Sequence, residues 1–319
     1  MIRYVLRRIL LLIPIIIGVS LLVYTLMELA PGTVIDSFIG EGMTTEDLNA
    51  LRAQYDLDKP MLYRYGKYML NLLRGDLGIS YRSKIPVWNT YIQRLPNTLM
   101  LSAVALVLGS VVSIPMGIQA AMHAGTLRDN ATTSFTLIGL SMPNFWTGLL
   151  LMLLFAYQLH WLPAGNNDQG FKSLIMPGVC SALVMTAIST RQTRASMLEV
   201  LKADFLRTAR AKGVPENVVI RKHALGNALI PTVTAIGTSL CYQLAGSAVV
   251  EQVFAWPGVG RMMIEGVLSR DIPVIMGCAI MTSILYSMVM LAVDLIYAFL
   301  DPRIKAQYAS VKKIRRKTA

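Results

Sequence analysis

Three polar side chains recur every four residues in an otherwise apolar stretch: Ser239, Gln243 and Ser247. On a helix, this spacing places them on one face. Such a face lines either a contact between helices or a passage for a polar solute. Tyr242 lies beside them, and Asp294 is an acid within another apolar stretch, which by default makes it a functional candidate. For Asp294 the alternative is a structural pair with a Lys or Arg of a nearby loop.

The segment Trp256-Pro257-Gly258-Val259-Gly260 is a second candidate, because Pro and Gly together mark a turn. We expect a structural turn that leads into a short re-entrant or interfacial helix and holds an outer gate. Direct contact of Trp256, Pro257 and Gly258 with a solute is the alternative.

Residue types that carry catalysis or bind metals do not occur in usable combinations. The three histidines lie on different segments and give no metal-site spacing: His123, His160 and His223. The phosphate-binding motif G-x-x-x-x-G-K-[ST] is absent, since Tyr68 follows the only Gly-Lys pair, Gly66-Lys67. An intramembrane enzyme would need a partner for Asp294 or an HExxH motif. We therefore expect no metal, no cofactor and no enzymatic activity in this chain.

Composition indicates the environment in which these residues act. Hydrophobic residues make up 54% of the 319 residues and charged residues only 15%, whereas about a quarter of residues are charged in a typical soluble domain. The 19 methionines would suit transport of a soft metal, but Met also commonly fills adaptable apolar cores. The excess of apolar surface predicts a membrane protein.

Six charge-poor runs approach the roughly 20 apolar residues that a helix needs to cross a bilayer. They are Ile9–Met27, Leu99–Ala121, Phe135–Tyr157, the shorter Ser173–Thr190, and two runs between Lys222 and Glu251 and between Asp271 and Asp294. Because hydrocarbon leaves no backbone polar group unpaired, each run should be helical. The expected fold class is an all-α integral membrane protein with six transmembrane helices.

The positive charges gather on one side of this expected bundle. Residues 191–223 hold eight Lys or Arg against three acids, and residues 301–319 hold seven against Asp301, whereas the segments on the other side are nearly balanced. An excess of Lys and Arg marks the cytoplasmic side, so both termini should be cytoplasmic. Topology then explains the net charge of +12 without nucleic-acid binding.

A small helical segment should follow the first helix on the extracytoplasmic side. Thr44 and Asp47 have the spacing of a capping box, and Pro60 suits the first turn of a second helix that Gly75 ends. A packed lid is the simpler interpretation of this segment, and solute contact is the alternative. The expected divisions are residues 1–94, with the first transmembrane helix at about 9–29, a transmembrane domain at 95–300, and a basic cytoplasmic tail at 301–319.

The cytoplasmic loop of residues 191–227 is charged, yet it has the pattern of a folded helical pair. Asp204 to Lys212 has the pattern of a helix with Gly213 at its C-terminal stop, and Pro215 begins another helix. A helix-glycine-helix corner that faces the cytoplasm is suited to docking in a groove of a partner.

Two motifs of this loop are distinctive. They are Arg207-Thr208-Ala209-Arg210-Ala211-Lys212-Gly213 and His223-Ala224-Leu225-Gly226-Asn227-Ala228-Leu229-Ile230-Pro231. Together they resemble the EAA-type coupling loop, with R-T-A in place of E-A-A, of permeases of binding-protein-dependent ABC importers in the dipeptide, oligopeptide and nickel group. Similar motifs extend along nearly the whole chain, at residues 4–8, 75–80, 141–146, 194–200, 254–261, 270–274 and 301–304.

The resemblance implies a type I ABC importer fold in the cytoplasmic (inner) membrane of a bacterium. It implies a translocation pathway for small peptides, with nickel or a metal chelate as the alternative cargo. The implied partners are a second homologous permease, one or two cytoplasmic ATPase subunits that bind ATP and Mg²⁺, and an extracytoplasmic binding protein. A stand-alone channel or secondary transporter would not need such a loop.

The resemblance also implies roles for single residues. Those expected to couple to the ATPase are Asp204, Arg207, Thr208, Ala209, Ala211, Lys212, Gly213 and Pro215. The spacing and residue types described above, rather than the resemblance, give the residues expected to line the pathway or gate: Ser239, Tyr242, Gln243, Ser247, Trp256, Pro257, Gly258 and Asp294.

The charge pattern makes a testable prediction about topology. A cysteine introduced at Glu46 should react with a membrane-impermeant thiol reagent in intact cells, whereas one at Ala319 should react only after the cells are opened, because the bilayer shields the cytoplasmic side. Strong labelling of position 319 in intact cells would contradict the predicted orientation.

Overall fold

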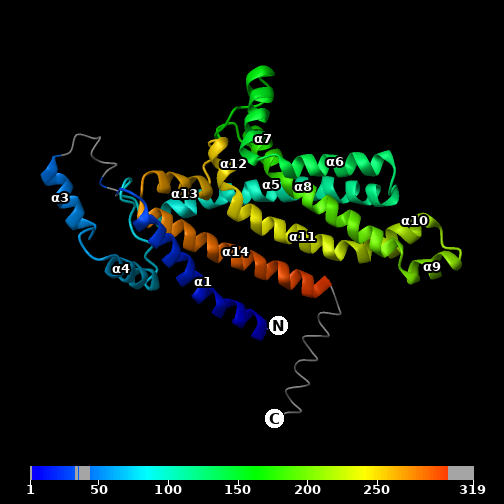
Figure 1. The fold of residues 1–319 in the computed structure, drawn as a ribbon, viewed down its shortest axis with the longest axis horizontal. Coiled ribbons are helices and arrows are strands. Elements are labelled where there is room, and N and C mark those ends of the chain that lie inside the picture. The colour runs from blue at the N-terminus through cyan, green and yellow to red at the C-terminus, as the bar shows by residue number, and fades with distance from the viewer. Residues whose placement is uncertain (1, 33–34, 36–43, 301–319) are drawn as a thin grey trace, which may run out of the picture. The chain divides into compact units, whose positions relative to one another are not determined.

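The computed structural model describes residues 2–32, 35 and 44–300, and this part of the chain is almost entirely helical. The helices of the first half are α1 (Ile2–Leu29), α3 (Thr45–Gln54), α4 (Met61–Leu73), α5 (Val87–Met122), α6 (Leu127–Ser141), α7 (Asn144–Leu151) and the π-helical η1 (Met152–Gln158). Those of the second half are α8 (Phe171–Leu201), α9 (Asp204–Ala211), α10 (Glu216–Val218), the π-helical η2 (Val219–Ala224), α11 (Leu225–Gly246), α12 (Ala248–Val253), α13 (Val259–Leu268) and α14 (Ile272–Leu300). Figure 1 shows their course. The expected tail at 301–319 lies outside the described residues.

Five helical stretches in the described residues are long and apolar enough to cross a membrane: Tyr4–Leu29, Val87–Met122, Phe171–Leu201, Glu216–Leu244 and Ile272–Ile296. A sixth crossing would be the pair Leu127–Ser141 and Asn144–Gln158, which is bent by 102°. The expected all-α fold with six apolar segments is therefore confirmed, with one segment broken.

The bend corrects the expectation of one continuous helix over Phe135–Tyr157. Met142 has the extended dihedrals φ −81° and ψ 123°, and Pro143 is at the N-cap position of α7. Proline has no N–H to continue the helix and disfavours helical dihedrals in the residue before it. The chain therefore turns sharply, and α7 projects away from α6 (Figure 1).

The chain forms two compact units. The first contains residues 100–244 and 288–300 of the described chain, and the second contains residues 2–99 and 245–287. Three helices, α5, α11 and α14, contribute residues to both units. Each unit combines residues from distant parts of the chain, whereas the sequence predicted a boundary between residues 94 and 95. The predicted division stays a prediction.

In the first unit, α5 and α8 approach each other closely. A Cβ atom on Gly117 would lie 2.5 Å from the Cβ of Thr193 and 2.8 Å from the Thr190 carbonyl oxygen, so only glycine fits. Gly237 is equally close to Val293 in this unit, again at 2.5 Å. Small residues at such contacts let helix backbones pack tightly, which stabilises helix association in lipid.

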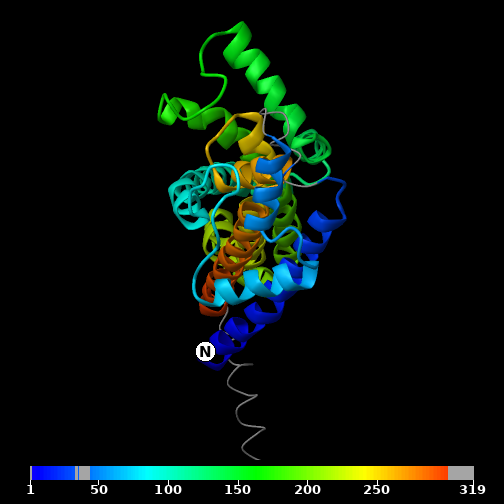
Figure 2. The ribbon, with the colours of Figure 1, turned by 90° about the vertical axis from the view of Figure 1, so that its left-hand side faces the viewer.

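In the second unit, the segment after α1 has the helices that its sequence predicts. The side chain of Thr44 accepts from the Asp47 backbone N–H, and Asp47 accepts in return from the Thr44 N–H, which completes the expected capping box. The helix α4 lies across α1 (Figure 2), where the rings of Tyr24 and Tyr65 meet edge to face at 5.6 Å. An ion pair of 2.5 Å between Arg64 and Glu28 fastens the same contact.

Candidate functional site

The corner between α9 and α10 has the geometry expected from its sequence. Gly213 is in the left-handed region with φ +74°. Its N–H donates to the Arg210 carbonyl at 2.9 Å, and the Val214 N–H donates to the Ala209 carbonyl at 3.3 Å. These two bonds form a Schellman motif, which satisfies carbonyl groups that the end of a helix would leave unpaired. Pro215 then caps α10.

A small apolar core holds the corner against the rest of its unit. Leu206 is fully buried in a cluster with Ala121 of α5, Met197 of α8, and Val219 and Ala224 of η2. The Arg210 guanidinium donates to both carboxylate oxygens of Glu216, at 3.1 and 2.8 Å, and so joins α9 to α10. The corner is therefore a folded element rather than a loose loop.

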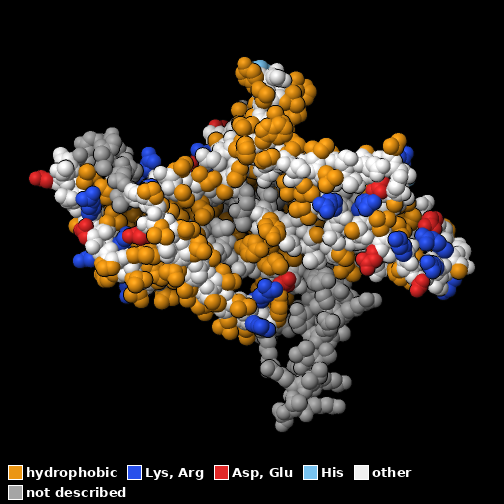
Figure 3. Space-filling view, viewed as in Figure 1, with side chains coloured by type: hydrophobic (Ala, Val, Ile, Leu, Met, Phe, Trp, Pro, Cys, Tyr) orange, Lys and Arg blue, Asp and Glu red, His pale blue; other side chains and the backbone are white. Residues whose placement is uncertain are grey.

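The outward face of the corner carries most of the predicted coupling residues. Exposed side chains or backbone are found at Asp204, Arg207, Thr208, Ala211, Lys212, Gly213 and Pro215. Ala209 differs from the expectation, since it is half-buried and packs inward against the Leu206 cluster. Lys, Arg, Asp and Glu side chains gather over α9 and α10 (Figure 3).

Phe205 is an exposed aromatic side chain on α9 that the sequence analysis missed. It is 46% exposed, although Leu206 beside it is fully buried. Helical periodicity over α9 could have separated the inward Leu206 from the outward Phe205. Aromatic side chains are common anchors in protein interfaces.

A buried ion pair braces α8 close to this corner. Asp129 of α6 is only 3% exposed, and its two oxygens accept from Nε and Nη2 of Arg194 at 2.5 and 2.7 Å. The Gly125 N–H donates to the same carboxylate at 2.9 Å. This bidentate geometry fixes orientation as well as distance. It connects the loop before α6 to the part of α8 that leads into α9.

The pathway candidates of the first unit differ in how far their side chains are exposed. Ser239 is buried, Tyr242 is 67% exposed, and Gln243 is half-buried with an Nε2 that has no partner among the described residues. Asp294 is half-buried on α14. Their pathway role stays a prediction.

The four-residue spacing predicted that Ser247 continues the polar face of α11. The structure shows that it does not. The helix ends at Gly246, and Ser247 precedes α12. Its hydroxyl donates to Glu251 Oε1 at 3.0 Å. Ser247 therefore belongs to the turn that follows α11.

The turn between α12 and α13 contains the other gate candidates and confirms the expected short helix after it. Ala255 is left-handed with φ +50°, and Trp256 is completely buried. The indole N–H of Trp256 donates to the Asn97 carbonyl at 3.0 Å, and the Asn97 side chain donates to the Pro257 carbonyl at 2.9 Å. A Cβ on Gly258 would lie 2.3 Å from the carboxylate of Glu251, so this position has no room for a side chain.

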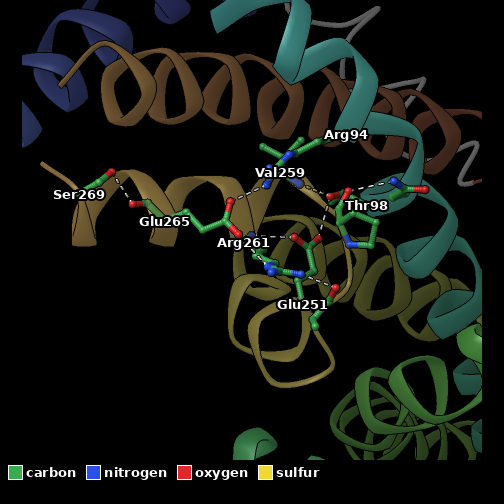
Figure 4. A network of polar contacts seen from close by, with 10 residues as sticks. Arg94, Thr98, Glu251, Val259, Arg261, Glu265 and Ser269 are labelled. Carbon is green, nitrogen blue, oxygen red and sulfur yellow. Dashed lines mark hydrogen bonds and ion pairs between the residues drawn. The ribbon is translucent and has the colours of Figure 1, made fainter. Parts of the chain in front are cut away.

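Glu251, which the sequence analysis used only as the end of an apolar run, is the centre of this turn (Figure 4). It is 0% exposed. Its Oε1 accepts from the hydroxyls of Thr98 at 2.7 Å and Ser247 at 3.0 Å, and its Oε2 accepts from the Arg261 N–H at 2.9 Å. Close by, Glu265 joins Arg94 at 2.8 Å and Arg261 at 2.9 Å. Burial of this kind is invisible in hydropathy.

No group of three or more His, Cys, Asp or Glu in the described residues could hold a metal ion. The three cysteines are all buried and free.

Two sequence families match the chain. Residues 113–306 match the family described as "Binding-protein-dependent transport system inner membrane component". Residues 1–102 match the family described as "Binding-prot-dependent transport system membrane comp, N-term".

Similar proteins cover almost the whole chain. It is 38% identical over 315 residues to the oligopeptide transport system permease protein AppB of Bacillus subtilis (strain 168), with 96% of this chain and 100% of the relative covered. It is 36% identical over 336 residues to the dipeptide transport system permease protein DppB of Escherichia coli (strain K12), with 96% and 99% covered. A chain of the MetNI methionine ABC transporter in an inward-facing conformation has a similar fold, with a TM-score of 0.56 and 18% identity over 66% of this chain and 96% of that one.

Replacement of Gly213 by Trp should leave membrane insertion intact and abolish transport. No atom of the described residues lies within 4 Å of a Cβ built at Gly213, so the indole would project from the corner without disturbing its core. The measurements are uptake and the amount of ATPase subunit that copurifies with the variant.

Gly75 provides a matched control for this substitution. It also follows a helix, with φ +81° and open space around its Cβ position, so Gly75→Trp carries the same backbone strain of about 1–2 kcal/mol away from the corner. Gly75→Trp should keep its ATPase subunits. Normal uptake by Gly213→Trp with normal subunit recovery would exclude the corner as the docking element.

Proposed function

The chain belongs to the family of binding-protein-dependent transport system inner membrane components, and we propose that its cargo is small peptides. As a member of that family it is a multi-pass permease subunit of an ABC importer in the inner membrane, not an enzyme. The support for peptides is that both relatives named above, each more than a third identical over nearly the full chain, are oligopeptide or dipeptide permeases. This support favours peptides over the nickel or metal-chelate alternative.

A cytoplasmic ATPase is the partner that we propose for the corner formed by α9 and α10. The corner is folded, exposed and charged, and Asp204 Oδ1 and Arg207 Nη1, which are 3.7 Å apart, are both open to water. Phe205 adds an exposed apolar side chain to the same helix. A partner groove could take up α9 as a preformed unit, which reduces the entropy lost on docking.

The corner can pass movement on to the membrane helices because it is packed onto them. Leu206 contacts the ends of α5 and α8 through its apolar cluster, and Asp129 holds α8 through Arg194. A displacement of docked α9 would therefore move α8 with it. In our proposal the ATPase subunits bind ATP and Mg²⁺, and their closure switches the permease from inward-open to outward-open.

The remaining parts of the proposal concern assembly and orientation. A second homologous permease and an extracytoplasmic binding protein would complete the transporter, with one or two kinds of ATPase subunit. The excess of Lys and Arg in residues 191–223 supports a cytoplasmic corner and cytoplasmic termini.

Uptake by the assembled transporter tests the proposed cargo. The chain, copurified with its ATPase and permease partners, is placed in liposomes with its binding protein outside and ATP inside. Labelled di- and tetrapeptides should accumulate, whereas ⁶³Ni²⁺ offered alone or with a chelating amino acid should not. ATP-dependent accumulation of nickel without peptide uptake would reverse this assignment, and uptake without any ATPase subunit would reject the importer.

Reversing both Arg207 and Lys212 to Glu should weaken ATPase association, because both charges lie on the exposed face of α9. If partner groups surround them in the complex, the cost is about 2 to 5 kcal/mol and the ATPase should dissociate even at low salt. If they lie at the rim, only the salt dependence should change. A salt titration of ATPase copurification distinguishes the two cases.

Arg191 is an exposed cation of the same predicted loop that lies upstream of the corner, and Arg191→Glu serves as the control. A double variant with normal stoichiometry and salt dependence would remove Arg207 and Lys212 from the interface.

A further inference from the structure

We propose that Glu251 is a positioning residue that locks the residues 94–98 of α5 and the α12–α13 turn into one body, which stays closed throughout the transport cycle. The inference rests on the proposed transport function, because it concerns which contacts can open while a solute passes. We call the contacts of Glu251, Thr98, Asn97 and Trp256 the Glu251 clamp.

Among the described residues, no cation pairs with the buried carboxylate of Glu251. Three neutral donors satisfy it, namely the hydroxyls of Thr98 and Ser247 and the backbone N–H of Arg261. Arg261 directs its guanidinium elsewhere, to Glu265 at 2.9 Å and to the Ala255 carbonyl at 2.5 Å. Since a buried charge is tolerated only when it is fully hydrogen-bonded, all three donors must stay in place.

Thr98 ties α5 to both short helices with one hydroxyl. The oxygen donates to Glu251 of α12 at 2.7 Å and accepts from the Val259 N–H of α13 at 2.8 Å. Val259 and Arg261 are in the first turn of α13, whose N–H groups have no partner within the helix. The positive end of the α13 dipole also favours the carboxylate there. Glu251 and Thr98 together therefore complete the N-terminus of α13.

Asn97 adds two further bonds from the adjacent position. Its carbonyl accepts from the Trp256 indole, and its side-chain amide donates to the Pro257 carbonyl. The start of α13 also packs closely against α12. A Cβ on Gly260 would lie 2.5 Å from the Ala248 Cα, and one on Gly258 would collide with Glu251. The turn residues Trp256, Pro257 and Gly258 thus have a positioning task in this proposal.

Opening the Glu251 clamp would break the four bonds that join α5 to the turn, while the Ser247 hydroxyl and the Arg261 N–H would stay with Glu251. Glu251 Oε1 would lose the Thr98 hydroxyl, and the Trp256 indole N–H and the Val259 N–H would lose their partners. Glu265 offers a contrast in the same network: its side chain is 40% exposed, so water can replace its partners. Movements during transport should therefore occur at other contacts, with the clamp carried along as a unit.

A cysteine pair at Asn97 and Pro257 tests whether the clamp opens. The assembled transporter carries this pair in a background with Cys180, Cys241 and Cys278 replaced by alanine, and uptake by the reduced protein shows that it folds and works. Disulfide formation is measured without nucleotide and in the ATP-bound state trapped with vanadate. Since Cα atoms more than about 7 Å apart cannot form a disulfide, we expect equal rates in both states and undiminished uptake after crosslinking.

A rescue experiment tests Glu251 itself. In Glu251→Gln, the amide N–H₂ opposes the Arg261 N–H unless it faces the two hydroxyls, which must then turn to accept from it. Either way the negative charge at the N-terminus of α13 is lost, so uptake should fall by about tenfold, or about 1.4 kcal/mol. Crosslinking the Asn97→Cys and Pro257→Cys pair in that variant should restore uptake, since the bond replaces what Glu251 does. Glu265→Gln is the matched control and should keep near-normal uptake without a crosslink.

The outcomes are distinct. Disulfide formation confined to one nucleotide state, or uptake stopped by crosslinking and recovered by reduction, would overturn the closed clamp. A Glu251→Gln defect that crosslinking leaves unrepaired would overturn the positioning role. If the pair at 97 and 257 impairs folding, Arg94→Cys with Glu265→Cys, bridged by a short bis-thiosulfonate, replaces it, because this pair joins α5 to α13 without removing a donor to Glu251. Because the nucleotide comparison needs no peptide, failure of peptide uptake in the unmodified protein would refute the cargo alone.

Discussion

A polar group that is buried away from water must find its hydrogen bonds within the protein, and this constraint determines how the chain places its polar groups. Backbone groups meet it by forming helices, while buried side chains must find partners within the protein. Asp129 meets the constraint with the fork of Arg194 and the Gly125 N–H. Glu251 meets it with two hydroxyls and one backbone N–H. Each buried acid thereby links segments that are distant in the chain, and what satisfies its charge also fixes the geometry around it.

The helix ends show the same constraint in the backbone. The carbonyls at the end of α9 are satisfied by Gly213 and Val214, because glycine readily adopts a positive φ. The N–H groups at the start of α13 are satisfied by Thr98 and Glu251. The first ending uses only local residues, so α9 forms an independent corner that can face a partner. The start of α13 needs residues of α5 and α12 as well, so the turn at Gly258 forms only where these three helices meet.

Much of this architecture follows from the sequence. The capping box at Thr44, the stop at Gly213 and the apolar runs are local patterns, and the structure has each of them. The break at Pro143 was equally local but was missed, because hydropathy over Phe135–Tyr157 outweighed the restriction that proline places on the residue before it. Ser247 was misplaced for a similar reason, since a regular spacing was extended past the end of α11 at Gly246.

By itself, the sequence determined the fold class, the helical corner and the resemblance to importer permeases, because hydropathy, capping and the loop motif depend on residues near one another in the chain. The tertiary structure alone decided that Glu251 is fully buried and that Ala209 packs against the Leu206 cluster. It also paired Asp129 with Arg194 and Thr98 with Glu251. Those outcomes depend on which distant segments pack together, and a hydrogen bond between residues 98 and 251 leaves no trace in either local pattern.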